Sequence, residues 1–280
     1  MKTLFTCILS LALGIGLPGQ NLDETYALGT EQFRLRNYET SSLAFERVLF
    51  FGEGKYLAPS LEHLGKIEQL QGRFESAALY YSRAAKASEE YNERSRMVLS
   101  QSYCLLSLGK FKLALIELYG LSDNIPDSFL YYRNFLVGVA HFSENNFKES
   151  HDAFSAAFPD SAASTKQKLD SLFTRLEKIK HPNPRTAKIL SIIIPGAGQF
   201  YAGDIKNGFN SLLLTGAFFA LGLHTALNFS LFDALASVAP WVQRYYMGGF
   251  KRAEIIAANR LREKQDAVYQ QVLNLYSIDN

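Results

Sequence analysis

A glycine-rich stretch, IIIPGAGQFYAGD over residues 192–204, is the part of the sequence best suited to binding a phosphate group. Closely spaced glycines can form a loop whose main-chain N–H groups cradle phosphate oxygens. A P-loop also needs a lysine and then Ser or Thr after its second conserved glycine, whereas Gly203 is followed by Asp204 and Ile205. A dinucleotide-binding loop needs a third glycine where Tyr201 stands. The stretch therefore excludes both kinds of nucleotide site.

No other pattern in the sequence carries a recognisable catalytic or metal-binding chemistry. The five histidines are not spaced as metal ligands, and the chain has no HExxH, GxSxG or Cys/His arrangement. The histidines are His63, His141, His151, His181 and His224. We therefore expect a protein that is not an enzyme and that carries no cofactor and no metal.

Two ionisable residues, His224 and Asp233, stand in or beside apolar sequence, where such groups often have a function. If residues 231–250 form one helix, Asp233 and Arg244 are about three turns apart and face the same way. In the other interpretation, each lies at a membrane boundary and is solvated. We expect no catalysis from either arrangement.

Composition indicates a folded chain with no affinity for nucleic acid. The 280 residues include 29 basic and 27 acidic side chains, 13% aromatic residues and only 8 prolines. Residues 1–19 have one lysine, an uncharged apolar run and small residues at the end, which is typical of a cleaved signal peptide. Cleavage is expected after Gly19 or, alternatively, after Gly16, and an uncleaved anchor helix is the other possibility. Cleavage would leave Cys104 as the one cysteine, which we expect in the core because its neighbours are apolar.

The elements that dominate the first half of the chain are four in-phase repeats. Each has an aromatic anchor, a small residue three positions later, a bulky residue four positions beyond that, and Gly or Ser nine positions before the anchor. The anchors are Tyr38, Phe74, Phe111 and Phe147, the small residues Ser41, Ala77, Ala114 and Ser150, the bulky residues Phe45, Tyr81, Leu118 and Phe154, and the earlier residues Gly29, Gly65, Ser102 and Gly138. Small residues let two antiparallel helices approach closely, and polar turn pairs precede each anchor.

This pattern resembles the tetratricopeptide repeat over about residues 22–159. Residues 163–180 have the apolar spacing of a capping helix with a polar outer face, so the repeat domain is expected to span 22–180, followed by a linker over 181–187. The resemblance implies a solenoid of helical hairpins that binds an extended peptide or a helix of a protein partner. We therefore predict an all-α protein: a tetratricopeptide-type solenoid, a transmembrane helical hairpin and an amphipathic tail helix.

The family's binding groove is lined by the first helix of each repeat. The corresponding residues are Tyr26, Thr30 and Phe33, then Glu62, Lys66 and Gln69, then Leu99, Tyr103 and Leu106, and finally Phe135, Val139 and Phe142. The first repeat lacks the Lys/Asn pair with which some members hold a C-terminal carboxylate. The groove is expected to be apolar toward its C-terminal end, and it can bind a partner helix there. Alternatively, some of these side chains belong to the core.

The second half of the chain contains sequence suited to a lipid bilayer. Residues 207–229 are uncharged and long enough to span about 30 Å of hydrocarbon. Residues 231–250 are less apolar but carry Trp, Tyr and Arg, as membrane boundaries do. Residues 188–202 are too short to span and are predicted to form a re-entrant or interfacial helix. Residues 251–280 are predicted to form an amphipathic tail helix.

The run Pro195-Gly196-Ala197-Gly198-Gln199-Phe200-Tyr201-Ala202-Gly203, followed by Gly208, resembles a small bacterial membrane module with the hallmark Pro-Gly-x-Gly-Gln-x-Tyr. The resemblance covers about residues 188–259 and implies a membrane-entry turn with closely approaching helices. It implies no biochemical activity. The residues that carry it are Pro195, Gly196, Gly198, Gln199, Tyr201, Gly203 and Gly208.

These features lead us to expect a membrane-anchored scaffold of the bacterial cell envelope that binds a protein or peptide partner through its repeats. The signal peptide favours the inner membrane with the repeats in the periplasm, although basic residues on both sides of the module favour a cytoplasmic placement. In a second hypothesis the hairpin forms a homo-oligomer or part of a transport or export assembly, with the repeats as its docking arm. A third is a soluble cytoplasmic repeat adaptor.

Overall fold

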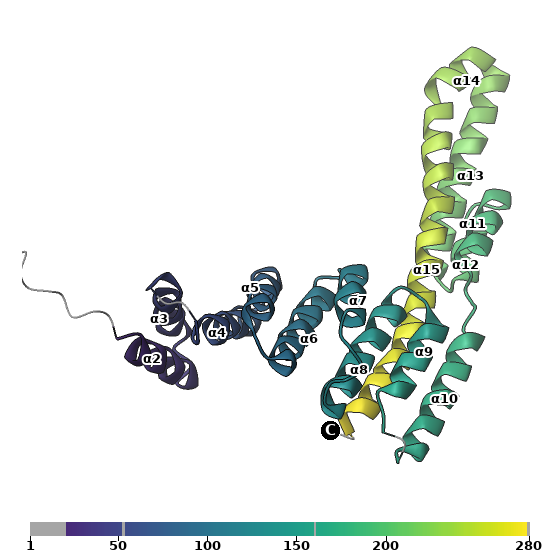
Figure 1. The fold of residues 1–280 in the computed structure, drawn as a ribbon. Coiled ribbons are helices and arrows are strands. Elements are labelled where there is room, and N and C mark those ends of the chain that lie inside the picture. The colour runs from purple at the N-terminus through teal and green to yellow at the C-terminus, as the bar shows by residue number, and fades with distance from the viewer. Residues whose placement is uncertain (1–20, 52–53, 160, 279–280) are drawn as a thin grey trace, which may run out of the picture. The chain divides into compact units, whose positions relative to one another are not determined.

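The computed structural model describes residues 21–51, 54–159 and 161–278. The predicted signal peptide, 1–19, lies outside these residues. Within them, every regular element is a helix (Figure 1), which confirms the all-α prediction. The helices form two compact units, residues 1–162 and 163–280, and each is described by itself.

The first unit consists of helical hairpins formed by consecutive helices. Its helices are α2 (Leu22–Arg34), α3 (Tyr38–Phe51), α4 (Leu57–Leu70), α5 (Phe74–Ala87), α6 (Tyr91–Ser107), α7 (Phe111–Tyr119), α8 (Asp127–Ser143) and α9 (Phe147–Ala156). The second helix of every hairpin begins at the aromatic anchor recognised in the sequence. Within residues 21–51 and 54–159, the period therefore predicted both the number of helices and the start of every second one.

Small residues bring the two helices of a hairpin together, as their spacing predicted. A Cβ atom added to Gly138 would lie 2.8 Å from the ring of Phe154, and the same construction at Gly65 gives 2.9 Å to Tyr81. A side chain at these positions would overlap the ring, so the bulky residue is fully covered by the backbone opposite it. In the last hairpin, Ser150 adds a hydrogen bond of 2.9 Å from its Oγ to the carbonyl oxygen of Gly138.

The turn between the two helices has the same backbone form in all four hairpins. Its left-handed residue is Arg36, Gly72, Gly109 or Asn145, with φ between 62° and 74°. In the first hairpin the N–H of Arg36 donates to the carbonyl of Phe33, and the N–H of Asn37 donates to that of Gln32. This pair of bonds is the Schellman motif, which ends a helix by satisfying its last carbonyl groups. The polar turn pairs seen in the sequence thus end each first helix.

The second unit begins with a helix that the sequence placed with the repeats. Its helices are α10 (Ala163–Lys178), α11 (Pro184–Ile193), α12 (Ala197–Tyr201), α13 (Ile205–Asn228), α14 (Leu231–Ser237) and α15 (Ala239–Ile278). Helix α10 was predicted to cap the repeat array, but it groups with this unit and packs along α15. Arg175 Nη2 on α10 donates a 2.9 Å hydrogen bond to Gln271 Oε1 on α15. The partner of its apolar face lies about a hundred residues away, which a local pattern does not reveal.

The chain from residue 231 onward is divided differently from the prediction. Residues 231–250 do not form one helix, because the chain breaks at Val238 just before Pro240, which lacks the N–H needed to continue α14. Residues 239–278 then run as a single helix of 40 residues, so the predicted boundary at 250/251 is absent. Asp233 and Arg244 consequently lie on different helices, and the predicted three-turn alignment between them is wrong.

The predicted helix over 188–202 is also divided. Helix α11 already begins at Pro184, inside the predicted linker, because the Asn183 side chain accepts a hydrogen bond from the N–H of Thr186 and caps it. The chain breaks at Pro195-Gly196, where Gly196 has φ +92°, and resumes as the short helix α12. Helices α13 and α15 lie side by side, with α14 at the turn between them (Figure 1).

Candidate functional site

The glycine-rich motif packs α12 into the space between α11 and α13. A Cβ atom at Gly198 would lie 1.9 Å from the carbonyl oxygen of Ala187, and one at Gly196 would lie 2.3 Å from that of Gly208. A Cβ atom at Gly208 would in turn lie 2.6 Å from the ring of Phe200. No residue with a side chain fits at these three positions without a shift of the backbone or of the ring. The motif glycines therefore permit close helix approach, as the membrane-module resemblance implied.

Gln199 is the polar centre of this packing, and its side chain is fully buried. Its Nε2 donates to the carbonyl oxygen of Gly249 on α15 at 2.9 Å, and its Oε1 accepts from Ser191 Oγ on α11 at 2.8 Å. Ser191 Oγ also accepts from the N–H of Gly198 at 2.9 Å. We call these four residues the Gln199 network. It satisfies the buried amide and joins three helices.

The remaining motif residues hold the chain on either side of α12. Tyr201 places its hydroxyl 2.9 Å from Nδ1 of His181 and accepts the N–H of Asn183 at 3.1 Å, which ties the end of α12 to the start of α11. Gly203 adopts φ +82° with open space around it. Pro195 lies in the break that precedes α12. None of these groups points to a catalytic centre, and their common effect is structural.

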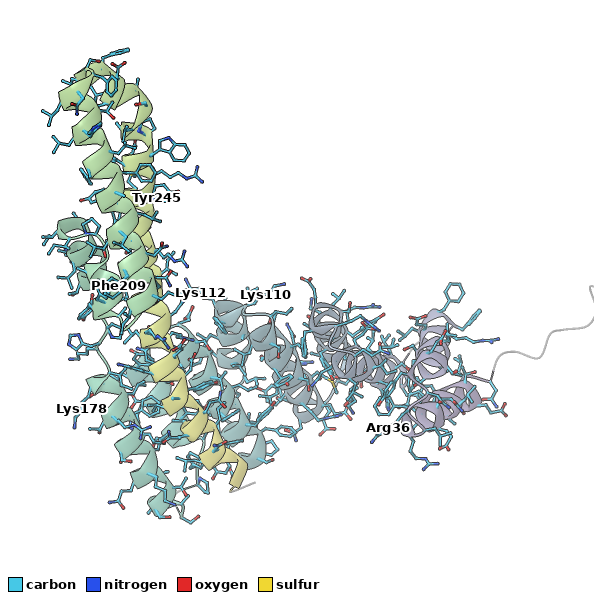
Figure 2. The ribbon with its side chains drawn as sticks, turned by 180° about the vertical axis from the view of Figure 1, so that it is seen from behind. Arg36, Lys110, Lys112, Lys178, Phe209 and Tyr245 are labelled. Atoms are coloured by element: carbon cyan, nitrogen blue, oxygen red, sulfur yellow. The ribbon has the colours of Figure 1, made fainter. Side chains whose placement is uncertain are left out.

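Helices α13 and α14 expose apolar side chains on nearly all sides. Among the described residues, α13 is the one helix long and apolar enough to cross a membrane, and 6% of its most apolar stretch is buried. Leu227 is 76% exposed and Phe232 is 78% exposed. An apolar surface of this extent marks contact with a membrane or with another protein. Figure 2 shows side chains projecting outward along the hairpin that α13 and α15 form, with Phe209 of α13 and Tyr245 of α15 labelled.

A cavity of about 240 Å³ with a mixed polar and apolar lining opens between α13 and α15, next to the Gln199 network. Its walls include two arginines of α15 and hydroxyl or amide groups of α12 and α13, and no acidic residue is among its lining residues. The polar groups that matter here are Gln199, Asn210, Ser211, Thr215, Arg244 and Arg252. Ser211 Oγ and Thr215 Oγ1 are buried and have no hydrogen-bond partner. Nothing in the sequence pointed to this cavity, because it forms between segments about forty residues apart.

The residues of the predicted groove do not form one continuous exposed surface. Leu99 and Phe142 are buried, so they offer no surface to a partner, and Glu62 is buried as well. Tyr103 is 39% exposed, whereas most of the others are half-buried. The half-buried residues are Tyr26, Phe33, Lys66, Leu106, Phe135 and Val139. The alternative that some groove positions belong to the core therefore holds for Leu99 of the third repeat and Phe142 of the fourth.

In the first hairpins, the predicted groove residues pack between neighbouring repeats. The ring of Tyr26 stacks on Tyr56 at a centroid distance of 4.6 Å, and Phe33 meets His63 edge-on at 5.4 Å. His63 also stacks on Phe45 at 4.6 Å. Burial lowers the pKa of His63 below its usual value of 6.5. These rings bind α2 and α3 to α4.

Glu62, which was predicted to line the groove, forms an ion cluster that was not predicted. It is paired with Lys66 Nζ at 2.6 Å and with Arg96 of the next hairpin, whose Nη2 lies 3.0 Å from Oε2. Burial alone would raise the pKa of Glu62, but the hydrogen bonds and charges of Lys66 and Arg96 outweigh it and lower that pKa. Arg96 was not predicted, although it stands 34 residues after Glu62, about one repeat along.

Two further observations limit the chemistry of the described residues. They contain no group of three His, Cys, Asp or Glu side chains arranged to hold a metal ion. Cys104 is buried in the core, as predicted, and burial raises the pKa of its thiol to about 11.

Comparisons of the chain with protein-family models, with curated proteins and with solved structures found no match.

Proposed function

We propose that this protein is a membrane-anchored scaffold whose tetratricopeptide-type repeats bind a protein or peptide partner beside the bilayer. The observation that carries the proposal is helix α13, which is uncharged from Asn207 to Asn228 and has 6% of its most apolar stretch buried. The repeat unit also exposes apolar side chains, such as Phe50 at 81%, but there they stand among ion pairs and polar turns. Lipid is the environment in which such a hairpin is stable.

Extraction of membranes with alkaline carbonate tests the anchor. The full chain is expected to stay in the membrane pellet, because the exposed apolar side chains of α13 have no other apolar cover within their unit. A chain that is released quantitatively, and that stays monodisperse without detergent, contradicts the anchored proposal and favours the soluble adaptor.

Site-specific photocrosslinking in the full chain tests partner binding. Tyr103 on the first helix of the third hairpin is accessible, and Ile116 on the second helix of the same hairpin is 67% exposed. A crosslinker at position 103 is expected to capture one defined protein, whereas one at position 116 captures no such partner. Equal capture at both positions contradicts a binding surface on the first helices.

The proposed location is the inner membrane of a bacterial envelope, with the repeats in the periplasm. Leu43 on α3 is 61% exposed, and Cys104 is buried with a raised pKa, so a Leu43→Cys variant carries one reactive thiol in the repeat unit. A membrane-impermeant maleimide applied to intact cells with a permeabilised outer membrane is expected to label it. Labelling only after lysis places the repeats in the cytoplasm.

A second candidate is that the hairpin forms a homo-oligomer, as part of a transport or export assembly. An apolar groove near α14 favours it, since small residues there leave room for a neighbouring helix; they are Gly222, Ala226 and Ala234. The molar mass of the detergent-solubilised full chain distinguishes this candidate from a simple tether. A mass equal to one chain contradicts it.

A further inference from the structure

The cavity between α13 and α15 has polar residues in its wall, whereas the outer faces of the hairpin are apolar. Thr215 lies ten residues into α13, about 15 Å from its start at 1.5 Å per residue. In a spanning helix this level is within the hydrocarbon layer, whose thickness is about 30 Å. Asn207 and Arg252, which also line the cavity, lie near the start of α13. The cavity therefore extends inward from the level of the lipid headgroups.

Two residues that line the cavity carry buried hydroxyl groups with no hydrogen-bond partner among the described residues. Thr215 is fully buried, and neither its Oγ1 nor Ser211 Oγ makes a hydrogen bond in the described structure. Buried polar groups in folded proteins are nearly always hydrogen-bonded, so two orphan donors in one cavity point to a bound molecule with acceptor oxygens.

The charge of the cavity selects among such molecules. Arg244 and Arg252 both line it, and no carboxylate does. Asp204 lies close enough to Arg252 to interact with it electrostatically, but the Asp204 carboxylate itself accepts hydrogen bonds from Asn207 at 2.6 and 3.0 Å. Water would satisfy the hydroxyls, whereas only an anion also compensates a guanidinium at membrane depth.

We propose that this cavity binds the phosphate group of an anionic membrane lipid. The two guanidinium groups pair with the phosphate oxygens, and Ser211 and Thr215 donate to them. The volume of about 240 Å³ is several times the roughly 30 Å³ of one water molecule, which leaves room for a phosphate and part of its glycerol. The acyl chains then lie on the exposed apolar face of the hairpin. The assignment of a lipid to this cavity rests on the proposed membrane insertion of the hairpin, and it does not depend on the proposed partner binding.

Two glycines provide a matched test. A Cβ atom at Gly248, which lines the cavity, or at Gly216, which does not, would meet no atom within 4 Å. Gly248→Leu therefore fills the cavity without a clash at Cβ, and Gly216→Leu makes the same change elsewhere in the hairpin. Arg244→Gln removes one guanidinium, and Lys251→Gln removes a neighbouring charge that does not line the cavity.

The full chain has a single tryptophan, Trp241, one turn before Arg244, and its fluorescence reports on adjacent lipid. The chain is reconstituted into phosphatidylcholine vesicles in which either brominated phosphatidylglycerol or brominated phosphatidylcholine is the quencher. We expect roughly tenfold preference for phosphatidylglycerol near Trp241, since each arginine contributes to the attraction of anionic lipid. Gly248→Leu is expected to reduce the preference to about one and Arg244→Gln to about threefold, since Arg252 remains, while Gly216→Leu and Lys251→Gln retain it.

Equal quenching by the two lipids in the unmodified chain overturns the proposal, as does full preference in Gly248→Leu. Addition of inorganic phosphate is the second arm: loss of the preference at millimolar phosphate assigns the cavity to a soluble anion and overturns the lipid assignment. Helicity measured for each variant shows whether it is folded. If Arg244→Gln does not fold, the uncharged substitution Gly248→Leu still tests the proposal. Failure of the chain to float with the vesicles contradicts the membrane anchor itself, a result distinct from loss of lipid preference.

Discussion

The Nε2 atom of Gln199 donates a 2.9 Å hydrogen bond to the carbonyl oxygen of Gly249, 50 residues further along the chain. This bond joins the five-residue helix α12 to the middle of α15. Because the other end of the amide is bonded to Ser191 on α11, one buried side chain fixes the relative positions of three helices. The glutamine of the motif is therefore a structural residue.

Replacement of this glutamine tests that role. Gln199→Leu keeps most of the volume but leaves the Ser191 hydroxyl without its acceptor, so we expect the full chain in detergent to lose about 1–3 kcal/mol of stability. Thermal unfolding followed by circular dichroism measures the loss. Gln243→Leu makes the same change at an exposed position of α15 and is expected to have little effect. Equal unfolding temperatures for the two variants would contradict the role of the network.

A methyl group added at Gly198 should destabilise the protein, whereas one added at Gly216 should not. In Gly198→Ala the new atom would lie 1.9 Å from the Ala187 carbonyl, so α12 must move away from α11, at a cost of about 1–3 kcal/mol or more. Gly216→Ala has open space and is expected to stabilise α13 by about 0.5–1 kcal/mol. Comparison of their thermal unfolding measures both effects. A Gly198→Ala variant as stable as Gly216→Ala is inconsistent with the packing described.

The turn residue Arg36 is expected to be replaceable by glycine with a gain in stability. Its φ of 62° is in the left-handed region, and the equivalent turns of the second and third hairpins use Gly72 and Gly109. Arg36→Gly removes the strain of a side chain there, which exceeds the entropic cost of glycine, so we expect a gain of about 0.5–1 kcal/mol. Figure 2 labels this residue.

The control for the turn is Arg83→Gly, in the interior of α5, which should lower the free energy of unfolding by about 1 kcal/mol. Urea unfolding followed by circular dichroism compares the two variants. Destabilisation by both of them would show that the left-handed turn carries no strain.

The stability of the first hairpins should fall as the pH drops below 6.5. Burial lowers the pKa of His63 in the folded chain, while in the unfolded chain it stays near 6.5. Below pH 6.5 the unfolded chain takes up a proton at His63 that the folded chain does not. The contribution of neutral His63 to the free energy of unfolding is therefore complete above pH 6.5, and it is lost as the pH falls through the pKa of the folded chain. One such group changes stability by at most about 1.4 kcal/mol per pH unit.

His63→Phe removes this titration and keeps a ring among Tyr26, Phe33 and Phe45. The difference in unfolding free energy between this variant and the unmodified chain is expected to grow in favour of the variant from pH 7 to pH 5. His151→Phe, in the fourth hairpin, serves as the control. A difference for His63→Phe that is constant with pH would mean that the folded chain binds the proton as readily as the unfolded one.

The helical repeats could be predicted because their signals are local. Each contact of Gly65 with Tyr81 or Gly138 with Phe154 joins residues sixteen positions apart, and the same spacing recurs in every repeat. The long-range contacts could not be predicted in this way. Arg96 pairs with Glu62 across a repeat boundary, and Leu99 and Phe142 are buried although their positions are equivalent to groove residues.

The sequence by itself determined that the chain is helical, where the second helix of each repeat begins and that α13 is apolar enough for a bilayer, because these properties follow from the order of neighbouring residues. Only the tertiary structure decided that α10 belongs with α15, that the chain after Pro240 is one helix, and that Arg244, Ser211 and Thr215 line one cavity. Those relationships depend on which distant segments pack together, and packing follows from complementary shape and burial that a linear pattern does not contain.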